Sequence, residues 1–192
     1  FVQQVNNRNE RFTIRYVGNL LASQKAPAFW RAAARMHHEN KIDFLIEIIG
    51  RADNSVIEEV RKNHLEKIVC VKGFESHIKA IEAMCAADAL LFIVPDVVGN
   101  EKIITGKILE YLAAEKPIIA IGNRAGDAAY LLRECSRDEM CDYADEEQIF
   151  NYLKNFYAHF LKGERKPVNK HHTIFSRKMQ THQLAQILSV LQ

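Results

Sequence analysis

The feature that most constrains the fold is a regular alternation of short apolar segments with helical ones. The pattern predicts strands at residues 12–18, 43–50, 68–73, 89–94 and 117–122, and the first three of these end in glycine. Helices are expected at residues 27–40, 55–63, 76–86, 106–114, 126–134 and 146–161. Strands that alternate with helices favour right-handed βαβ units, which build a parallel sheet covered by helices on both faces.

We therefore predict an α/β fold, a Rossmann-like three-layer α/β/α domain over residues 11–165. Its parallel sheet has about six strands, the sixth a short segment at residues 141–143, and the chain ends in a long helix. Residues 1–10 are interpreted as a linker. Residues 166–192 are interpreted as a C-terminal linker and an amphipathic helix that packs on the domain or reaches back to a missing one. Because the chain begins with Phe1 and a polar stretch, we expect a piece of a longer protein.

Composition excludes several classes of function. The 192 residues are 48% hydrophobic, which is enough for one well-formed core. A net charge of +2 argues against nucleic-acid binding through a strong positive field. The four cysteines show no CxxC spacing, which favours a reduced protein in the cytoplasm, and the paired histidines lack partners for a metal site. No apolar run of about 18 residues predicts a membrane span.

The strongest site signal is the run TGKILEYLAAEKPIIAI at residues 105–121, in which a polar turn opens an amphipathic helix before an apolar strand. The N-terminus of a helix exposes unpaired N–H groups that favour phosphate. Glu110, one turn in, is placed to accept hydrogen bonds from sugar hydroxyls, or it is a solvent-exposed helix residue. The glycine-ended loops should meet this helix start at one edge of the sheet, where α/β proteins bind ligands.

These segments, together with YVGNL, CAADALLF and GDAAYLL, resemble the C-terminal, donor-binding domain of GT-B fold glycosyltransferases of the retaining family-four type. The resemblance covers roughly residues 12–161. It implies transfer of a sugar from a nucleoside diphosphate sugar to an acceptor hydroxyl, without a metal or other cofactor. It also implies that an N-terminal acceptor-binding domain is missing, so that this part of the protein is inactive alone.

The resemblance carries over to particular residues only in part. The family has two glutamates separated by seven residues. The second matches Glu110 and implies a contact with the donor ribose. The first falls on Lys102, with Glu101 one position away, so no catalytic residue is assigned.

For the diphosphate, the resemblance implies the backbone amides of Thr105 and Gly106 and cations in the loop that follows Gly18. Asn19 stands at the family's arginine position, and Lys25 lies near the lysine position. Lys107 could supply the missing cation, or it is a surface lysine that pairs with Glu110.

For the base, the loop after the third strand offers Phe74 and Glu75, although Phe74 could equally lie in the core. Arg51 is either a solvated loop charge or a donor contact. A sugar-nucleotide epimerase and a non-catalytic flavodoxin-like binding module remain alternatives. The expected partners are the nucleotide-sugar donor and the missing domain, with peripheral membrane contact through that domain left open. The expected location is the cytoplasm, with the inner face of the membrane also open.

Overall fold

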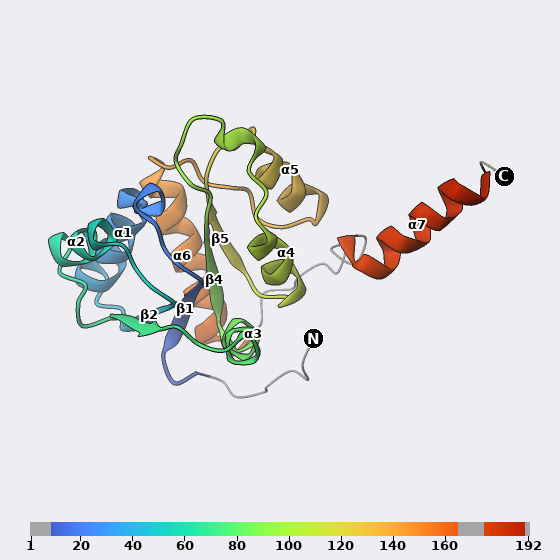
Figure 1. Cartoon of the computed structure of the whole chain (residues 1–192). Helices are drawn as coiled ribbons and strands as arrows, with labels where there is room; N and C mark the ends of the chain where they lie inside the picture. Colours follow the sequence, from blue (N-terminus) through green and yellow to red (C-terminus); the bar gives the residue numbers. More distant parts are fainter. Residues whose placement is uncertain (1–8, 165–174, 191–192) are drawn as a thin grey trace.

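The computed structural model describes residues 9–164 and 175–190. Within them, five parallel strands form one sheet in the order β3-β2-β1-β4-β5. Figure 1 shows this sheet between two layers of helices, which confirms the predicted α/β/α architecture. The strands are β1 (Phe12–Val17), β2 (Phe44–Ile49), β3 (Val69–Gly73), β4 (Ala89–Ile93) and β5 (Ile118–Ile121).

The short sixth strand predicted at residues 141–143 is reduced to one position. Cys141 forms an isolated parallel bridge with Ile121 at the edge of β5. Its N–H donates to the carbonyl of Ala120, and its own carbonyl accepts from Gly122. Cys141 thus pairs with backbone groups at the edge of β5, and the chain then turns away from the sheet. The described sheet therefore has five strands.

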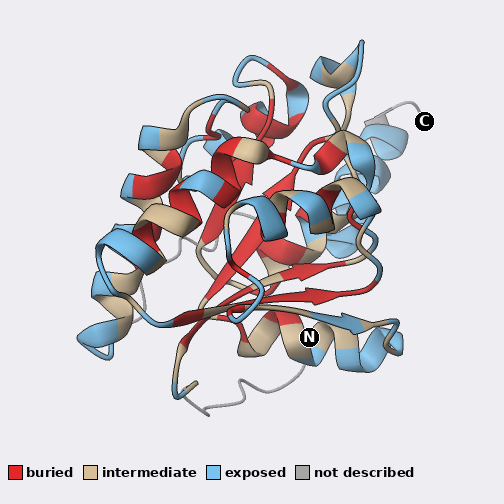
Figure 2. Cartoon of the chain, turned by 90° about the vertical axis from the view of Figure 1, so that its left-hand side faces the viewer, coloured by how far each residue is buried: buried red, intermediate tan, exposed pale blue. Residues whose placement is uncertain are grey.

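Helices cover both faces of the sheet, and each face has its own hydrophobic core. The first core includes Trp30, Val56 and Ile149 and lies under α1 (Pro27–Ala34), α2 (Asn54–Lys62) and α6 (Glu146–Leu161). The second core lies under α3 (His77–Ala86), α4 (Gly106–Ala113) and α5 (Asp127–Glu134). Figure 2 shows the buried residues concentrated in the sheet and on the inner faces of the helices. Burial on both faces explains why β4 is apolar at every position.

The spacing of apolar residues accounts for α4, the helix that forms part of the candidate site. In α4, Ile108, Tyr111 and Leu112 are spaced along one face and are buried in the second core. Two short 3₁₀ helices were not predicted, η1 (Ala22–Gln24) after β1 and η3 (Asn100–Lys102) after β4. A π-helical turn, η2 (Arg35–Glu39), extends α1 to the end predicted for it.

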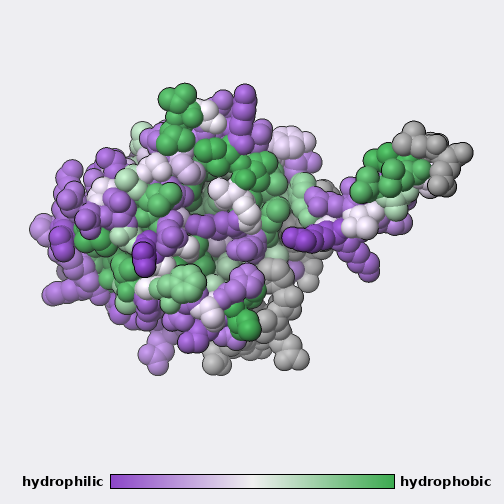
Figure 3. All heavy atoms as spheres, in the orientation of Figure 1, coloured by the Kyte–Doolittle hydropathy of each residue, from purple (hydrophilic) through white to green (hydrophobic). Residues whose placement is uncertain are grey.

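The C-terminal helix α7 (Arg177–Val190) is exposed along the side chains described for it, residues 177–189. Leu184 and Ile187 are 56% and 61% exposed, and Figure 3 shows apolar side chains on the surface of this helix. Phe175, just before it, packs against the second core. The predicted packing of this helix on the domain is not seen in the residues described, and its packing partner stays a prediction. Among the described helices, none combines the length and hydropathy of a membrane span.

Candidate anion-binding site between β1 and β4

The two central strands, β1 and β4, separate toward their carboxyl ends. Their register has only two Cα pairs, both near the start of β4. Beyond them, the N–H of Val17 donates to the phenol oxygen of Tyr111 at 2.8 Å. The side-chain amide of Gln24 donates to the carbonyl of Ile93 at 2.6 Å. Side chains thus replace strand-to-strand hydrogen bonds, and the gap lies at the topological switch point where open α/β sheets bind ligands.

Two glycines with positive φ shape the loops at this edge. Gly50 has φ +138°, and a Cβ there would lie 2.3 Å from the carbonyl oxygen of Gly18. Gly18 has φ +115°, and a Cβ there would lie 3.1 Å from Nζ of Lys107. The absence of side chains lets the two loops pack together and leaves space for the lysine. The structure therefore brings the Gly18 loop against the start of α4, as the sequence predicts.

Lys107 is the central charge of this site. Its Nζ lies 2.6 Å from the hydroxyl of Tyr16 and 3.8 Å from the centroid of that ring. Burial lowers the pKa of Lys107 to about 8, and the negative charge of Glu110 only partly opposes this effect. Within residues 9–164 and 175–190, no carboxylate lies within ion-pair distance of this amine. The site therefore holds a cation that forms no ion pair with the described residues.

The N-terminus of α4, the helix that carries Lys107, adds hydrogen-bond donors. Thr105 is the N-cap residue by its backbone, but its hydroxyl makes no capping hydrogen bond. That hydroxyl is buried and has no partner among the described residues. The amides of Gly106 and Lys107 lie in the first turn and have no intrahelical acceptor. A hydroxyl, two amides and an amine are the groups that bind a phosphate at a helix N-terminus.

Asn19 and Lys25, the two residues predicted for the loop after β1, make different contacts. Asn19 is exposed, and its Oδ1 accepts a hydrogen bond of 3.2 Å from the amide of Arg51. It therefore connects the loops that follow β1 and β2. Lys25 has an exposed side chain, while its carbonyl accepts the indole N–H of Trp30 at 2.6 Å.

The residues predicted for the base lie farther along the sheet edge. Phe74 is 88% exposed, which excludes the core interpretation of this ring. Glu75 lies 3.4 Å from the amine of Lys79, one helical turn away. Both follow β3, which β2 separates from β1. Among the contacts described for the chain, none joins either residue to Lys107, so their role stays a prediction.

The residues nearest the family's first glutamate have no contact with Lys107 among those described for the chain. Glu101 and Lys102 are exposed in η3, and the backbone of Glu101 packs against Gly126. Their side chains form none of the ion pairs or hydrogen bonds found in the described part of the chain. The structure leaves the catalytic position unassigned.

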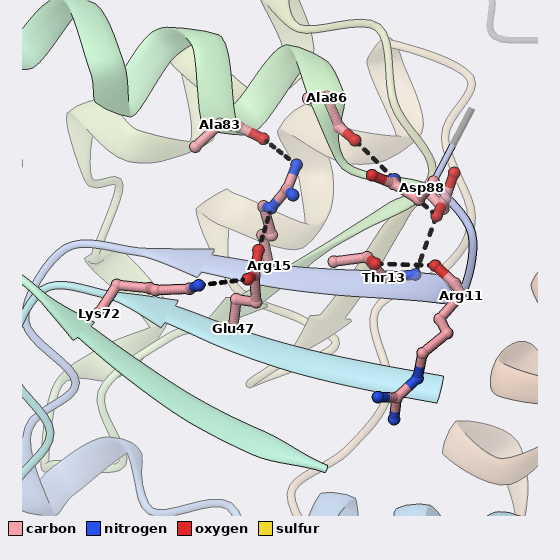
Figure 4. Close-up of polar contacts among 9 residues, drawn as sticks. Arg11, Thr13, Arg15, Glu47, Lys72, Ala83, Ala86 and Asp88 are labelled. Carbon is pink, nitrogen blue, oxygen red and sulfur yellow. Dashed lines mark hydrogen bonds and ion pairs between the residues drawn. The ribbon is translucent and has the colours of Figure 1, made fainter. Parts of the chain in front are cut away.

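A second polar cluster, here called the Glu47 cluster, consists of Arg15, Glu47 and Lys72 on the other face of the sheet from Tyr16. Figure 4 shows the Glu47 carboxylate between the two cations, 2.7 Å from Nε of Arg15 and 3.2 Å from Nζ of Lys72. Burial acts to raise the pKa of Glu47, but these two cations outweigh it and hold the pKa below its usual range. A cleft of about 460 Å³ beside the cluster is also lined by Glu75, Lys79 and Glu82.

Sequence reasoning missed Tyr16, Gln24 and Tyr111, which line the gap between the strands. Each has a polar group that is buried in an otherwise apolar setting. Such groups need hydrogen-bond partners when they are buried. The tyrosine at the start of the run YVGNL, in a strand expected to be buried, could therefore have indicated a polar contact inside the domain. Its partner depends on the separation of β1 and β4, which the sequence pattern does not reveal. Among the described residues, no group of three or more His, Cys, Asp or Glu side chains could hold a metal.

Fold and site together define a doubly wound α/β domain with a buried lysine amine and the N-terminus of α4 at its switch point. The sequence matches the family described as "Glycosyl transferases group 1" over residues 11–158, and the chain belongs to this family. No curated protein matches the sequence.

Solved structures with the same fold are distant in sequence. The C-terminal domain of a glycosyl transferase group 1 family protein from Francisella tularensis is 16% identical, with a TM-score of 0.63 over 91% of this chain and 94% of that one. Sucrose-phosphate synthase from Thermosynechococcus elongatus is 16% identical, with a TM-score of 0.68 over 98% of this chain and 48% of that one. A pneumococcal O-GlcNAc transferase solved with UDP and GlcNAc is 12% identical, with a TM-score of 0.59 over 88% and 32%. This chain thus spans half or less of the two longer proteins.

Proposed function

We propose that this domain binds the nucleoside diphosphate of an activated sugar in the crevice between β1 and β4. It would then be the donor-binding half of a retaining glycosyltransferase. The observation that carries the proposal is the buried amine of Lys107, which has no carboxylate partner among the described residues. Lys107 belongs to the first turn of α4, whose N-cap residue Thr105 has a buried hydroxyl without a partner among those residues. A diphosphate supplies the counter-charge that this arrangement lacks.

Each side chain then has a chemical role. Lys107 and the amides of Thr105 and Gly106 offset the negative charge that grows on the leaving diphosphate. Because this charge is met by the chain's own donors, we propose transfer without a bound metal. Glu110 accepts hydrogen bonds from the ribose. The backbone amide of Arg51 contacts Asn19 in the loop after β1, and we propose the guanidinium of Arg51 as a second cation.

The ring of Phe74 is exposed at the same edge of the sheet and is free to stack on a base. Two proteins with this fold, the pneumococcal O-GlcNAc transferase and MnaA of S. aureus, were solved with UDP, which supports a nucleoside diphosphate as the ligand. Since the chain spans half or less of the longer similar proteins, we propose that an acceptor-binding domain completes the enzyme. We expect the domain alone to bind donor weakly and to transfer nothing. A cytoplasmic location, at or near the inner face of the membrane, stays a prediction.

The test is a thermal-shift panel of the purified chain with UDP, GDP, ADP, CMP and FMN at millimolar concentration. A ligand that binds only the native state raises the apparent stability with the logarithm of its concentration over its Kd. We expect a shift with at least one nucleoside diphosphate and none with FMN. Glu110→Ala should reduce the shift, whereas Glu82→Ala, an exposed glutamate on α3, should leave it intact.

A folded chain that responds to no diphosphate would contradict the proposal for this domain. A shift with FMN alone would favour the flavodoxin-like alternative.

A further inference from the structure

Tyr16 is a fully buried residue whose phenol oxygen meets three polar groups. It lies 2.6 Å from Nζ of Lys107, 3.0 Å from the carbonyl of Asn19 and 3.3 Å from Oε1 of Gln24. The phenol hydrogen is donated to one of the two oxygens, so the phenol oxygen accepts from the lysine amine. Gln24 is itself fixed by its bond to the carbonyl of Ile93. The acceptor for Lys107 therefore has a set position between β1 and β4.

We propose that Tyr16 is a positioning residue that holds the amine of Lys107 in the crevice before the diphosphate binds. The inference rests on the proposed function. A lysine side chain has four rotatable bonds, and its ammonium is most stable in water. Here the ring face and the oxygen of Tyr16 together replace that water. The Lys107 side chain thus loses its conformational entropy when the chain folds and not when the diphosphate binds. The lower entropic cost of binding favours the complex with the diphosphate.

Few other groups titrate near this amine. Burial raises the pKa of Tyr16 to about 12 and raises that of Tyr111 as well, so both phenols stay neutral around pH 8. Glu110, on the same helix, is the carboxylate whose charge acts on Lys107. A change in ligand affinity near pH 8 therefore reports on the lysine amine. A phenol that accepts a hydrogen bond from an ammonium favours the charged form.

The test compares Tyr16→Phe with Tyr130→Phe, a control at a tyrosine that is 58% exposed on α5. Phenylalanine keeps the ring and its packing, so the fold should be retained, and circular dichroism checks this. In ligand-free protein with ¹³Cε-labelled lysine, the Lys107 signal is assigned by its loss in Lys107→Met. Tyr16→Phe should lower the midpoint of that signal by about 0.5 pH units or more. Tyr130→Phe should leave it in place. A midpoint unchanged by Tyr16→Phe would overturn the inference.

Binding of UDP, or of the diphosphate that gives the largest thermal shift, supplies the second readout. By calorimetry at pH 7, Tyr16→Phe in the otherwise wild-type chain should weaken diphosphate binding about tenfold. Without the phenol oxygen the Lys107 ammonium is not held in one position, and the ligand must order it. In a Lys107→Met background the same change should have no effect. Equal losses in both backgrounds would show a merely structural role and overturn the inference. If the lysine midpoint moves but no diphosphate binds the wild type, the positioning by Tyr16 stands and the proposed function fails.

Discussion

Arg15 and Tyr16 are neighbours on β1, yet the cations beside them are stabilised in opposite ways. On one face, Arg15 and Lys72 share the carboxylate of Glu47, which is nearly buried. The side chain of Tyr16 points to the other face, and its oxygen and ring hold the amine of Lys107, which extends from α4. This amine has no carboxylate within ion-pair distance in the described chain. A charge whose partner belongs to the same chain supports the fold. A buried cation without such a partner is a place for an external anion.

Folding lowers the pKa of both groups, so each makes stability rise with pH, Glu47 in the acid range and Lys107 between about pH 8 and 10.5. The pKa of Glu47 is lowered by folding, so its contribution to stability is present above its unfolded pKa and is lost as pH falls through the folded value. The pKa of Lys107 is lowered from 10.5 to about 8, so between these values the unfolded chain binds more protons. Stability should therefore rise with pH across that range on account of Lys107.

The largest effect on stability is expected at the Glu47 cluster. Glu47→Gln leaves Arg15 with a neutral partner in a buried setting, and it should lower the free energy of unfolding by about 3 kcal/mol. It should also weaken the loss of stability in acid that Glu47 causes. Urea unfolding at pH 7 and pH 4 measures both effects, with Glu82→Gln as the exposed control. Because this cluster lies away from the crevice, affinity for the diphosphate should change less than about twofold; a tenfold loss would refute the separation of the two regions.

The next effect is the loss of binding in Lys107→Met. Removing the cation should weaken diphosphate binding about 100-fold, which calorimetry can measure. The same change should raise the free energy of unfolding at pH 7 by about 1 kcal/mol, since a buried charge with no carboxylate partner is removed. That gain should shrink as pH rises from 8 toward 10.5, where the wild-type amine becomes neutral in the folded state. Lys62→Met, at an exposed position of α2, is the matched control. Unchanged affinity in Lys107→Met would exclude this amine from the site.

A smaller effect should follow from filling the space at Gly18. The methyl group of Gly18→Ala would lie 3.1 Å from Nζ of Lys107, at a φ of +115° that alanine rarely adopts. We expect a loss of about 1–2 kcal/mol in stability and about tenfold in diphosphate affinity. Gly99→Ala is the control, because its φ is +81° and a Cβ there has no neighbour within 4 Å. If both variants bind equally well, the glycine does not make room for the lysine.

The smallest effect is expected at Phe74. Because this ring is 88% exposed, Phe74→Ala should not lower stability measurably. If the ring stacks on the base, affinity for the nucleoside diphosphate should fall about fivefold, whereas affinity for inorganic pyrophosphate should be unchanged. The ratio of the two affinities is the measurement. A ratio equal to that of the wild type would remove Phe74 from the base site.

The sequence pattern was sufficient for features that depend on local periodicity. The strands that end at Gly18, Gly50 and Gly73 and the amphipathic helix from Gly106 predicted the parallel sheet and the meeting of the Gly18 loop with the start of α4. It was insufficient where tertiary contacts decide. The separation of β1 from β4 depends on Tyr111 and Gln24, which bond to backbone groups of distant strands. The single bridge at Cys141 and the exposure of Phe74 also depend on what packs nearby, which periodicity does not encode.

We infer that the amine of Lys107, which has no carboxylate partner among the described residues, marks the diphosphate site, and that the Glu47 cluster does not. A crystal structure of the chain with its best-binding nucleoside diphosphate tests this most directly. We predict phosphate oxygens within hydrogen-bond distance of Nζ of Lys107 and of the first amides of α4. A diphosphate bound instead in the cleft beside Arg15 and Lys72, with the Lys107 crevice empty, would contradict it.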